Sequence, residues 1–444
     1  MRLSAQAYCS FHWFYFYPLS IYRARRKPYN RAMKTLIVIG YVWPEPDSSA
    51  AGMRMMQLLT LYREASYRVI FASPADFSSH AINLDDHGIE SVTIQLNCSS
   101  FDEWVAKQAP DVVMFDRFMM EEQFGWRVEE QCPSALRILD MEDVHCLRDA
   151  RHKAIKAGRE LHPDDWHSDI AYREIAAILR CDLSLVISEY EMQWLTEHFP
   201  ISQDQLCYLP FMVDVMTQRT SAGFAERKQF VSIGNFRHAP NWDAVLRLKA
   251  LWPAIRKQLP QAEMHICGAY PPPKATQLHD IKSGFLVKGW AENAEAVVSS
   301  ARVMLAPLRF GAGLKGKLLE AAMLSTPAVT TSIGAEGMYG DLPAPVLVAQ
   351  TDDDFVELAV RLYRDENLWQ ELSVRGQPIL QQRFSLSEFG GCLLETTEHL
   401  LAGLERHRNN HFIGGMLRHH HLRSTRYMSQ WIEVKTQLRQ REEY

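Results

Sequence analysis

The sequence predicts an α/β protein made of two doubly wound domains in tandem. Short apolar runs rich in β-branched residues alternate with longer amphipathic segments between residues 35 and 349. Such runs are typical of buried strands, and strands that alternate with helices pair in parallel through right-handed crossovers. The alternation pauses at a polar stretch, residues 214–228, and then begins again. With 444 residues, the chain is also longer than one ordinary hydrophobic core can hold.

We expect a first Rossmann-like domain over residues 33–213, a linker over 214–228 and a second Rossmann-like domain over 229–390. The strands expected in the first domain are 35–40, 68–73, 91–96, 111–116, 136–141 and 183–188. Those expected in the second are 229–234, 262–268, 284–289, 302–307, 327–331 and 345–349. Two such domains face each other across a central cleft at the carboxyl ends of their strands, where open α/β sheets bind ligands.

The N-terminal extension, residues 1–32, contains an aromatic run at 11–22 that is followed by a basic cluster. A secretory signal has the opposite order, and about 12 residues cannot span a bilayer. Two interpretations remain open. The run is an interfacial membrane anchor, or residues 1–32 are an irregular extension before a functional start at Met33.

Residues 391–444 are expected to complete a C-terminal helix and then form a basic, histidine-rich tail. The helical pattern runs over 385–407 and is interrupted by the glycine pair at 390–391. The HHH at 419–421 offers metal ligands, but consecutive histidines point in different directions on a helix or strand. A solvated tail is therefore the preferred interpretation.

The composition is that of a globular protein, with 47% apolar and 23% charged residues. A formal charge of -5 gives no general attraction to nucleic acid. The eight cysteines show no CxxC pair and no Cys/His cluster at zinc spacing, which favours reduced thiols in a cytoplasmic protein. The aromatic N-terminus and the basic tail also permit peripheral contact with the inner face of a membrane.

The stretch RFGAGLKGKLLEAAMLSTPAVTT (309–331) joins an expected strand to an expected helix through a glycine-rich turn. Such a turn lets the backbone approach a ligand, and a helix N-terminus presents unpaired N–H groups to an anion such as phosphate. Lys315 and Lys317 add positive charge there, and Glu320 shares a helix face with Lys317 and can bind a ribose diol. The alternative is an ordinary turn with a surface pair between Glu320 and Lys317.

This stretch resembles the donor-binding segment of family 4 (group 1) glycosyltransferases, whose members have the two-domain GT-B fold. The matching residues are Ala306, Pro307, Gly311, Ala312, Gly313, Lys315, Gly316, Lys317, Glu320, Ala321, Pro327 and Thr330. SIGAEGM (332–338) and GNFRHAPNWDAV (234–245) also fit the family pattern. The resemblance implies a nucleotide-sugar site at Asn235, Arg237, Gly311, Gly313, Lys315, Lys317 and Glu320.

The first half matches the family more loosely. GYVWPEPDSSAAGMR (40–54) resembles a loop near the transferred sugar and phosphates, which places Ser49, Ala51, Gly52 and Arg54 at the cleft, with Gly52 in the donor site. The alternative is a flexible loop with Arg54 on a solvated helix face.

LDMEDVHCLRDAR (139–151) resembles the family's D-x-x-D-x-H-x-x-R segment, in which Asp140, Asp143, His145 and Arg148 take the four positions. The resemblance implies that His145 contacts the transferred sugar. Asp143, His145 and Lys317 are therefore the candidate catalytic residues. A structural histidine is the alternative.

ISEYEMQWL (187–195) matches the family's serine–glutamate pair, and a capping box of Ser188 and Glu191 explains it sufficiently.

The chain also departs from the family pattern. Ala312 stands where the first glutamate of the E-x7-E pair is expected, while Glu320 is the second. Asn235 and Pro240 stand near the positions of the family's diphosphate-binding Arg and Lys. Our hypothesis is that Arg237, Lys315 and Lys317 replace that charge, because a departing phosphate needs positive charge or helix-terminal N–H groups nearby.

The resemblance implies transfer of a sugar from a nucleotide diphosphate sugar to an acceptor hydroxyl, with retention at the anomeric carbon and without a metal or other cofactor. The partners expected are this donor and a carbohydrate or glycolipid acceptor, in polysaccharide or glycoconjugate synthesis. The first domain would receive the acceptor and the second the donor. Two rival functions remain open: a catalytically weak GT-B partner protein that binds nucleotide sugars, and a nucleotide-sugar epimerase.

Overall fold

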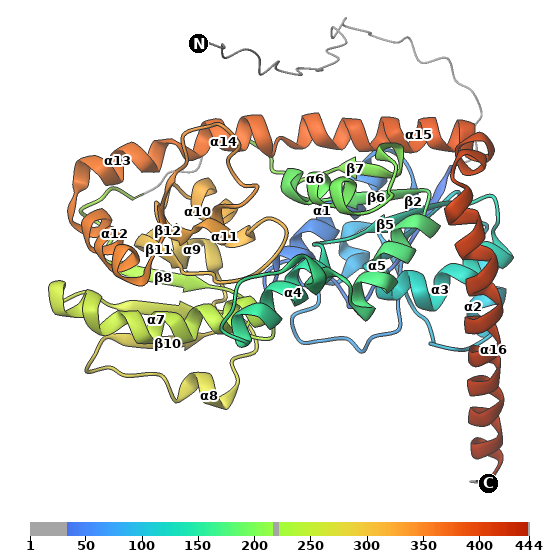
Figure 1. Cartoon of the computed structure of the whole chain (residues 1–444), viewed down its shortest axis with the longest axis horizontal. Coiled ribbons are helices and arrows are strands. Elements are labelled where there is room, and N and C mark those ends of the chain that lie inside the picture. Colours follow the sequence, from blue (N-terminus) through green and yellow to red (C-terminus); the bar gives the residue numbers. More distant parts are fainter. Residues whose placement is uncertain (1–32, 216–221, 443–444) are drawn as a thin grey trace, which may run out of the picture. The chain divides into compact units, whose positions relative to one another are not determined.

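Two parallel β-sheets organise the computed structural model, which describes residues 33–215 and 222–442 (Figure 1). The first sheet has the order β3-β2-β1-β4-β5-β6-β7 and the second the order β10-β9-β8-β11-β12-β13. The first sheet contains β1 (Thr35–Ile39), β2 (Arg68–Ser73), β3 (Glu90–Thr93), β4 (Val112–Asp116), β5 (Leu136–Asp140), β6 (Leu183–Val186) and β7 (Leu206–Tyr208). The second contains β8 (Gln229–Ile233), β9 (Met264–Cys267), β10 (Phe285–Gly289), β11 (Ala301–Ala306), β12 (Ala328–Thr331) and β13 (Val346–Ala349).

Helices connect the strands of both sheets. In the first half they are α1 (Ala50–Glu64), α2 (Ser100–Gln108), α3 (Phe118–Gln131), α4 (His145–Lys156), α5 (Asp169–Arg180) and α6 (Glu189–His198), with the 3-10 turns η1 (Leu84–His87), η2 (Pro163–Trp166) and η3 (Gln203–Gln205). In the second half they are α7 (Ala239–Gln258), α8 (Pro273–Thr276), α9 (Ala294–Ser300), α10 (Gly316–Met323), α11 (Ser332–Ala335), α12 (Asp352–Arg364), α13 (Glu366–Val374) and α14 (Gly376–Arg383). The chain ends in α15 (Leu386–Asn410) and α16 (Phe412–Glu442).

The predicted doubly wound architecture is confirmed. Each of the twelve expected strands overlaps an observed strand, and the short edge strand β7 is added to the first sheet. In both sheets the strand order reverses beside the first strand of the domain, β1 or β8, which is the switch point where doubly wound folds bind ligands. β1 and β4 are buried at every residue, and apart from Thr35 and Asp116 their sequences are apolar and do not alternate.

α15 returns the chain from the second domain to the first. It runs unbroken through the glycine pair at 390–391, where an interruption was expected, and its non-helical residue is Gly403. Leu393 and Leu400 pack into the apolar cluster that α1 and β1 form in the first domain. The hydroxyls of Tyr62 and Thr397 lie 2.7 Å apart in this buried interface. The boundary expected at residue 390 therefore falls inside a helix that is part of the first domain's core.

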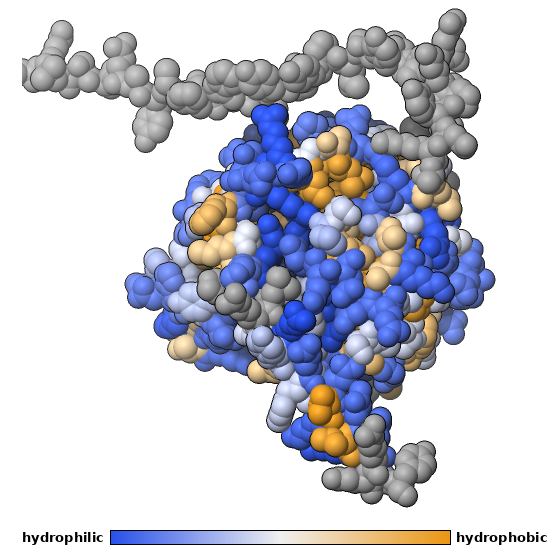
Figure 2. Space-filling model, turned by 90° about the vertical axis from the view of Figure 1, so that its right-hand side faces the viewer, coloured by the Kyte–Doolittle hydropathy of each residue, from blue (hydrophilic) through white to orange (hydrophobic). Residues whose placement is uncertain are grey.

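Residues 412–442, expected to be a solvated tail, form the long helix α16, and most of its described side chains are exposed to solvent. Its first half packs against α3 and α5, with Leu417 at the edge of the core of the first domain and Arg127 donating to Ser429 at 2.8 Å. Its last turns expose Tyr427, Trp431 and Leu438, and apolar surface gathers on this end of the molecule in Figure 2.

The N-terminal extension at 1–32, including the aromatic run at 11–22, lies outside the described residues, as does the middle of the expected linker, 216–221. Within the part of the chain that the structure describes, no helix has the length and apolar composition needed to cross a bilayer.

The contact between α15 and the first domain predicts that removing the Thr397 hydroxyl lowers the stability of the protein. Thr397→Val keeps the side-chain shape but leaves the buried Tyr62 hydroxyl without its partner, which we expect to lower the free energy of unfolding by about 1–3 kcal/mol. The double variant Tyr62→Phe with Thr397→Val removes both polar groups and should recover part of this loss. Thermal or urea unfolding measures it, with the half-buried neighbour Thr396→Val as control. Equal effects of the two threonine variants would contradict the role of this contact.

Candidate functional site

Two helix N-termini meet where the two domains touch. α1 begins after β1, with Ser49 as its N-cap accepting the N–H of Gly52 at 3.0 Å. α10 begins at Gly316 after β11, and a Cβ added to Gly316 would lie 2.5 Å from the Cβ of Ala50. Because helix N-termini carry unpaired N–H groups and partial positive charge, this junction favours an anion.

The turn before α10 needs its glycines. Gly311 has φ 154° and Gly313 has φ 62°, conformations that other residues rarely adopt. Gly313 also lies against the first domain, since an added Cβ would be 2.9 Å from the Cβ of Asp143. The structure thus brings the predicted donor loop beside the predicted catalytic segment.

Side chains from the first domain hold this turn from two sides. Arg151 on α4 donates to the carbonyl of Gly311 at 2.7 Å and makes a two-pronged ion pair with Glu336, at 2.8 and 2.9 Å. The ring of His152 stacks on Phe310 with centroids 4.3 Å apart. The loop is therefore tied to α4 through its backbone, its neighbouring aromatic ring and a charged partner.

Glu191 on α6 also attaches the turn before α10 to the first domain. The predicted capping box of Ser188 and Glu191 is wrong. Ser188 makes no side-chain cap bond. The buried carboxylate of Glu191 instead accepts the N–H of Gly313 at 2.7 Å and that of Val144 at 2.8 Å, so it serves one backbone group from each domain. Burial, with repulsion from Asp143, raises the pKa of Glu191 to about 7.

Asp143, His145 and Arg148 form one hydrogen-bonded cluster at the carboxyl end of β5. Arg148 donates to both carboxylate oxygens of Asp143, at 2.8 and 3.2 Å, and the Nδ1 of His145 lies 2.9 Å from the Asp143 carbonyl. Glu174 on α5 accepts the backbone N–H groups of His145 and Cys146 at 2.9 and 2.8 Å, so a carboxylate caps the start of α4.

The charges of this cluster are fixed by their neighbours. Burial would raise the pKa of Asp143, but Arg148 and His145 outweigh it and hold the pKa well below its usual range. Burial would lower the pKa of His145, but Asp143 and Glu174 outweigh it and raise the pKa. The cluster therefore presents a carboxylate and an imidazole that favours its charged form.

A pocket of about 260 Å³ opens beside this cluster. It is lined by Phe118, Met119, His145, Arg148, Asp149, His152, Ile170, Arg173, Ala239 and Phe310. Its wall combines both domains, with apolar rings and charged groups on the same surface, as expected for a site that holds a polar organic molecule.

Asn241 links two of the predicted donor residues and was missed by the sequence analysis. Its side-chain oxygen accepts from the Nζ of Lys317 at 2.9 Å, and its nitrogen donates to the carbonyl of Asn235 at 3.0 Å. Burial lowers the pKa of Lys317 to about 8, although Glu320 opposes this. Asn241 lies within the GNFRHAPNWDAV stretch, but the sequence gives no indication that it pairs with a residue 76 positions away.

Two other predicted cations lie differently from the expected arrangement. The Nζ of Lys315 turns back into its own loop, 2.5 Å from the carbonyl of Gly313 and 3.2 Å from that of Ala312. Arg237 is exposed, with its guanidinium 3.6 Å from the ring centroid of Tyr270. Of the three cations expected to balance the diphosphate, Lys317 is the one connected to the rest of the donor segment through Asn241.

Both expectations for Arg54 are wrong, because it is neither solvated nor in the cleft. It is fully buried, with Nε 3.0 Å from Asp140 and Nη1 2.7 Å from the carbonyl of Leu209. Arg54 and Asp140 thus join α1 and β5 to the chain leaving the first domain. Gly52 is buried too, and an added Cβ would lie 2.4 Å from the backbone of Glu45.

Comparisons with known proteins concern the second domain and the fold. Residues 227–365, which include the donor loop, match the family model described as Glycosyl transferases group 1. The three solved structures described below match between 67% and 83% of the chain. The fold is GT-B. No curated protein sequence matches the chain.

Three GT-B structures illustrate the likeness. Sucrose-phosphate synthase from Thermosynechococcus elongatus has a TM-score of 0.63 and 15% identity, covering 83% of this chain and 100% of its own. Anabaena Alr3699/HepE in complex with UDP-glucose has a TM-score of 0.63 and 12% identity, and the match covers 82% of this chain and 100% of that one. A TarM variant from S. aureus in complex with UDP has a TM-score of 0.54 and 13% identity, and the match covers 67% of this chain and 58% of that one.

The bridging carboxylate of Glu191 predicts a graded loss on mutation. Glu191→Ala leaves two buried N–H groups without an acceptor, which we expect to cost about 1–3 kcal/mol for each group. Glu191→Gln keeps an acceptor oxygen and should retain most of the stability. Unfolding midpoints of the two variants measure this, with the exposed Glu197→Ala on the same helix as control. An alanine variant as stable as the glutamine variant would contradict the bridge.

Proposed function

We propose that this protein is a family 4 glycosyltransferase that moves a sugar from a nucleotide diphosphate sugar to an acceptor hydroxyl, with retention at the anomeric carbon. One observation carries the proposal. The donor loop at Gly311–Gly313 lies directly against the Asp143–His145 segment, at the junction of two helix N-termini. The family match over this loop and the GT-B neighbours that contain UDP or UDP-glucose support the same function.

Donor binding in this proposal uses the second domain together with the N-terminus of α1 from the first. The diphosphate lies near the N-termini of α1 and α10, and Lys317 supplies the positive charge that a departing phosphate needs. Asn241 holds Lys317 and the Asn235 turn in one unit. Glu320, on the same face of α10 as Lys317, accepts the hydroxyls of the ribose.

The chemical step in this proposal needs no carboxylate nucleophile. The bond between the anomeric carbon and the phosphate oxygen breaks, a bond forms to the acceptor oxygen on the same face, and the acceptor proton passes to the departing phosphate. His145, whose pKa is raised by Asp143 and Glu174, donates a hydrogen bond to the transferred sugar. The acceptor enters the pocket of about 260 Å³ beside Arg148.

The proposal extends to the acceptor only as a class, a carbohydrate or glycolipid used in polysaccharide or glycoconjugate synthesis at the cytoplasmic side of a membrane. TarM, one of the structural neighbours, was solved with alpha-GlcNAc-glycerol as well as UDP, which supports an acceptor of this kind.

A panel of UDP-, GDP-, ADP- and dTDP-sugars tests the donor site by thermal unfolding. A ligand that binds only the folded protein raises the unfolding midpoint. At a concentration of 100 times its Kd, it adds about 2.7 kcal/mol to the free energy of unfolding. We expect one nucleotide class to stabilise the protein and Glu320→Ala to lose this shift, with the exposed Glu357→Ala of α12 as control. An unchanged shift in Glu320→Ala would refute its ribose contact. Donor conversion without acceptor would indicate an epimerase, and binding without turnover across many acceptors a weak partner protein.

The lowered pKa of Lys317 predicts a pH dependence of donor binding. Lys317 is charged below pH 8 and loses its proton as the pH rises through about 8, so the affinity for UDP should fall by up to about tenfold between pH 7 and pH 9. Lys317→Arg stays charged over this range and should bind UDP with a flatter profile. Calorimetric titration at both pH values measures it, and parallel profiles for the two proteins would assign the pH effect to another group.

A further inference from the structure

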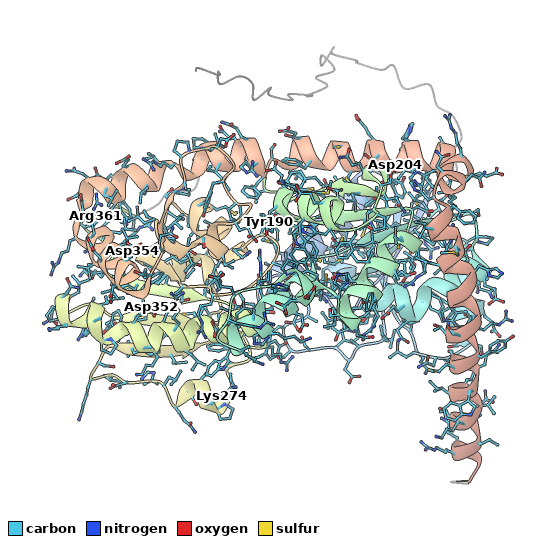
Figure 3. All side chains as sticks on the ribbon, in the orientation of Figure 1. Tyr190, Asp204, Lys274, Asp352, Asp354 and Arg361 are labelled. Carbon is cyan, nitrogen blue, oxygen red and sulfur yellow. The ribbon has the colours of Figure 1, made fainter. Side chains whose placement is uncertain are left out.

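Two histidines at the end of α15 lie beside an aspartate from the first domain. His407 lies in the last turn of α15 and His411 is the C-cap residue that follows it, and the centroids of their rings are 4.6 Å apart. Asp204 comes from η3, between α6 and the edge strand β7, and Figure 3 labels it beside this end of α15. One ligand atom from each of the three side chains lies within 4.8 Å of the others. Asp204 Oδ2 is 3.2 Å from His411 Nε2 and 4.0 Å from His407 Nδ1.

The hydrogen bonds of His407 determine which nitrogen faces this cluster. Its Nε2 lies 2.8 Å from the backbone carbonyl of Asp182. A carbonyl oxygen only accepts, so Nε2 carries a hydrogen, and Nδ1 is the ring nitrogen that faces Asp204 and can offer a lone pair to a metal ion. A lone pair and a carboxylate oxygen then face each other, an arrangement that a bound cation stabilises. Metal-binding histidines are commonly oriented in this way, by donating their other N–H to a carbonyl.

The surroundings of the cluster also favour a cation. The side chains of His407 and His411 are 9% and 11% exposed, whereas that of Asp204 is 54% exposed, so water can reach the open side. The two histidines lie at the C-terminal end of α15, where the helix dipole is negative. The neighbouring Arg408 directs its charge away, to both carboxylate oxygens of Asp182 at 2.7 and 2.8 Å.

We propose that Asp204, His407 and His411 bind one divalent transition-metal ion of the Zn²⁺ class, with water completing the coordination. Two imidazole nitrogens and one carboxylate suit Zn²⁺, Co²⁺ or Ni²⁺, whereas Mg²⁺ and Ca²⁺ prefer oxygen ligands alone. The ion connects the last turn of α15 to η3 and so stabilises the return of the C-terminal helices to the first domain. None of the three residues belongs to the proposed glycosyl-transfer site.

The test uses the full chain, stripped of metal with a chelator and then titrated with ZnCl₂ or MgCl₂. We expect Zn²⁺ to raise the unfolding midpoint, Mg²⁺ to leave it unchanged, and calorimetry to give one Zn²⁺ per chain at this cluster. Co²⁺ should give the visible absorption bands of a site with nitrogen ligands. His407→Ala, His411→Ala and Asp204→Asn should each weaken Zn²⁺ binding at least about tenfold, since loss of an outer hydrogen-bond partner alone has an effect of that size.

Two controls separate this site from other histidines. His399→Ala changes an exposed histidine two turns earlier on α15 and should bind Zn²⁺ as the unmutated protein does. A triple alanine variant of residues 419–421 removes the HHH tract and should also retain the site. Asp204→Asn alters an exposed side chain, so it tests the site even if His407→Ala fails to fold. No Zn²⁺ binding by the unmutated chain, unchanged binding in Asp204→Asn and His411→Ala, or loss only in the triple variant would overturn the proposal.

Discussion

The junction between the two domains depends on the need of buried backbone N–H groups for an acceptor. The N–H groups of Gly313 and Val144 belong to different domains, and a single carboxylate, that of Glu191, satisfies both. A buried N–H group without a partner costs more than an ordinary hydrogen bond contributes, so this carboxylate fixes the spacing between the glycine-rich turn before α10 and the segment that begins α4. The glycine at 313 follows from that spacing, because the backbone lies too close to Asp143 for any side chain.

The charged groups around this junction fall into two classes. Arg151 with Glu336 and Arg54 with Asp140 are paired and buried, and they hold the backbone segments that shape the cleft. Lys317, half-buried and hydrogen-bonded to a neutral asparagine, keeps its charge available to a ligand. A buried ion pair contributes little net stability but resists the loss of either partner, so the first class favours one fixed geometry. The second class supplies charge where a diphosphate would lie.

The parts of the fold that could be predicted are those that depend on patterns among residues close together in the sequence. Strands buried on both faces leave continuous apolar runs, and glycine-rich turns before helices leave a readable spacing, so both sheets and the loop at 309–331 could be placed in advance. The contacts of Glu191 could not, because a serine–glutamate spacing at a helix start has a sufficient local explanation in a capping box. The burial of Arg54 could not be predicted either, because its partner Asp140 is 86 residues away in the sequence. Asp204 and His411 are separated by 207 residues, so their meeting appears only after folding.

The path of the chain between the domains limits how the cleft can open. The chain crosses from the first domain to the second after Val213 and returns at Phe384–Leu386. The two crossings are bonded to each other, since Val213 donates to the carbonyl of Phe384 at 2.7 Å and accepts from Leu386 at 3.1 Å. Any change in domain angle must therefore bend both crossings together. α15 begins at once beyond the return crossing and is packed into the first domain. Interactions that hold α15 in place, including those at its far end, therefore fix the return crossing against the first domain.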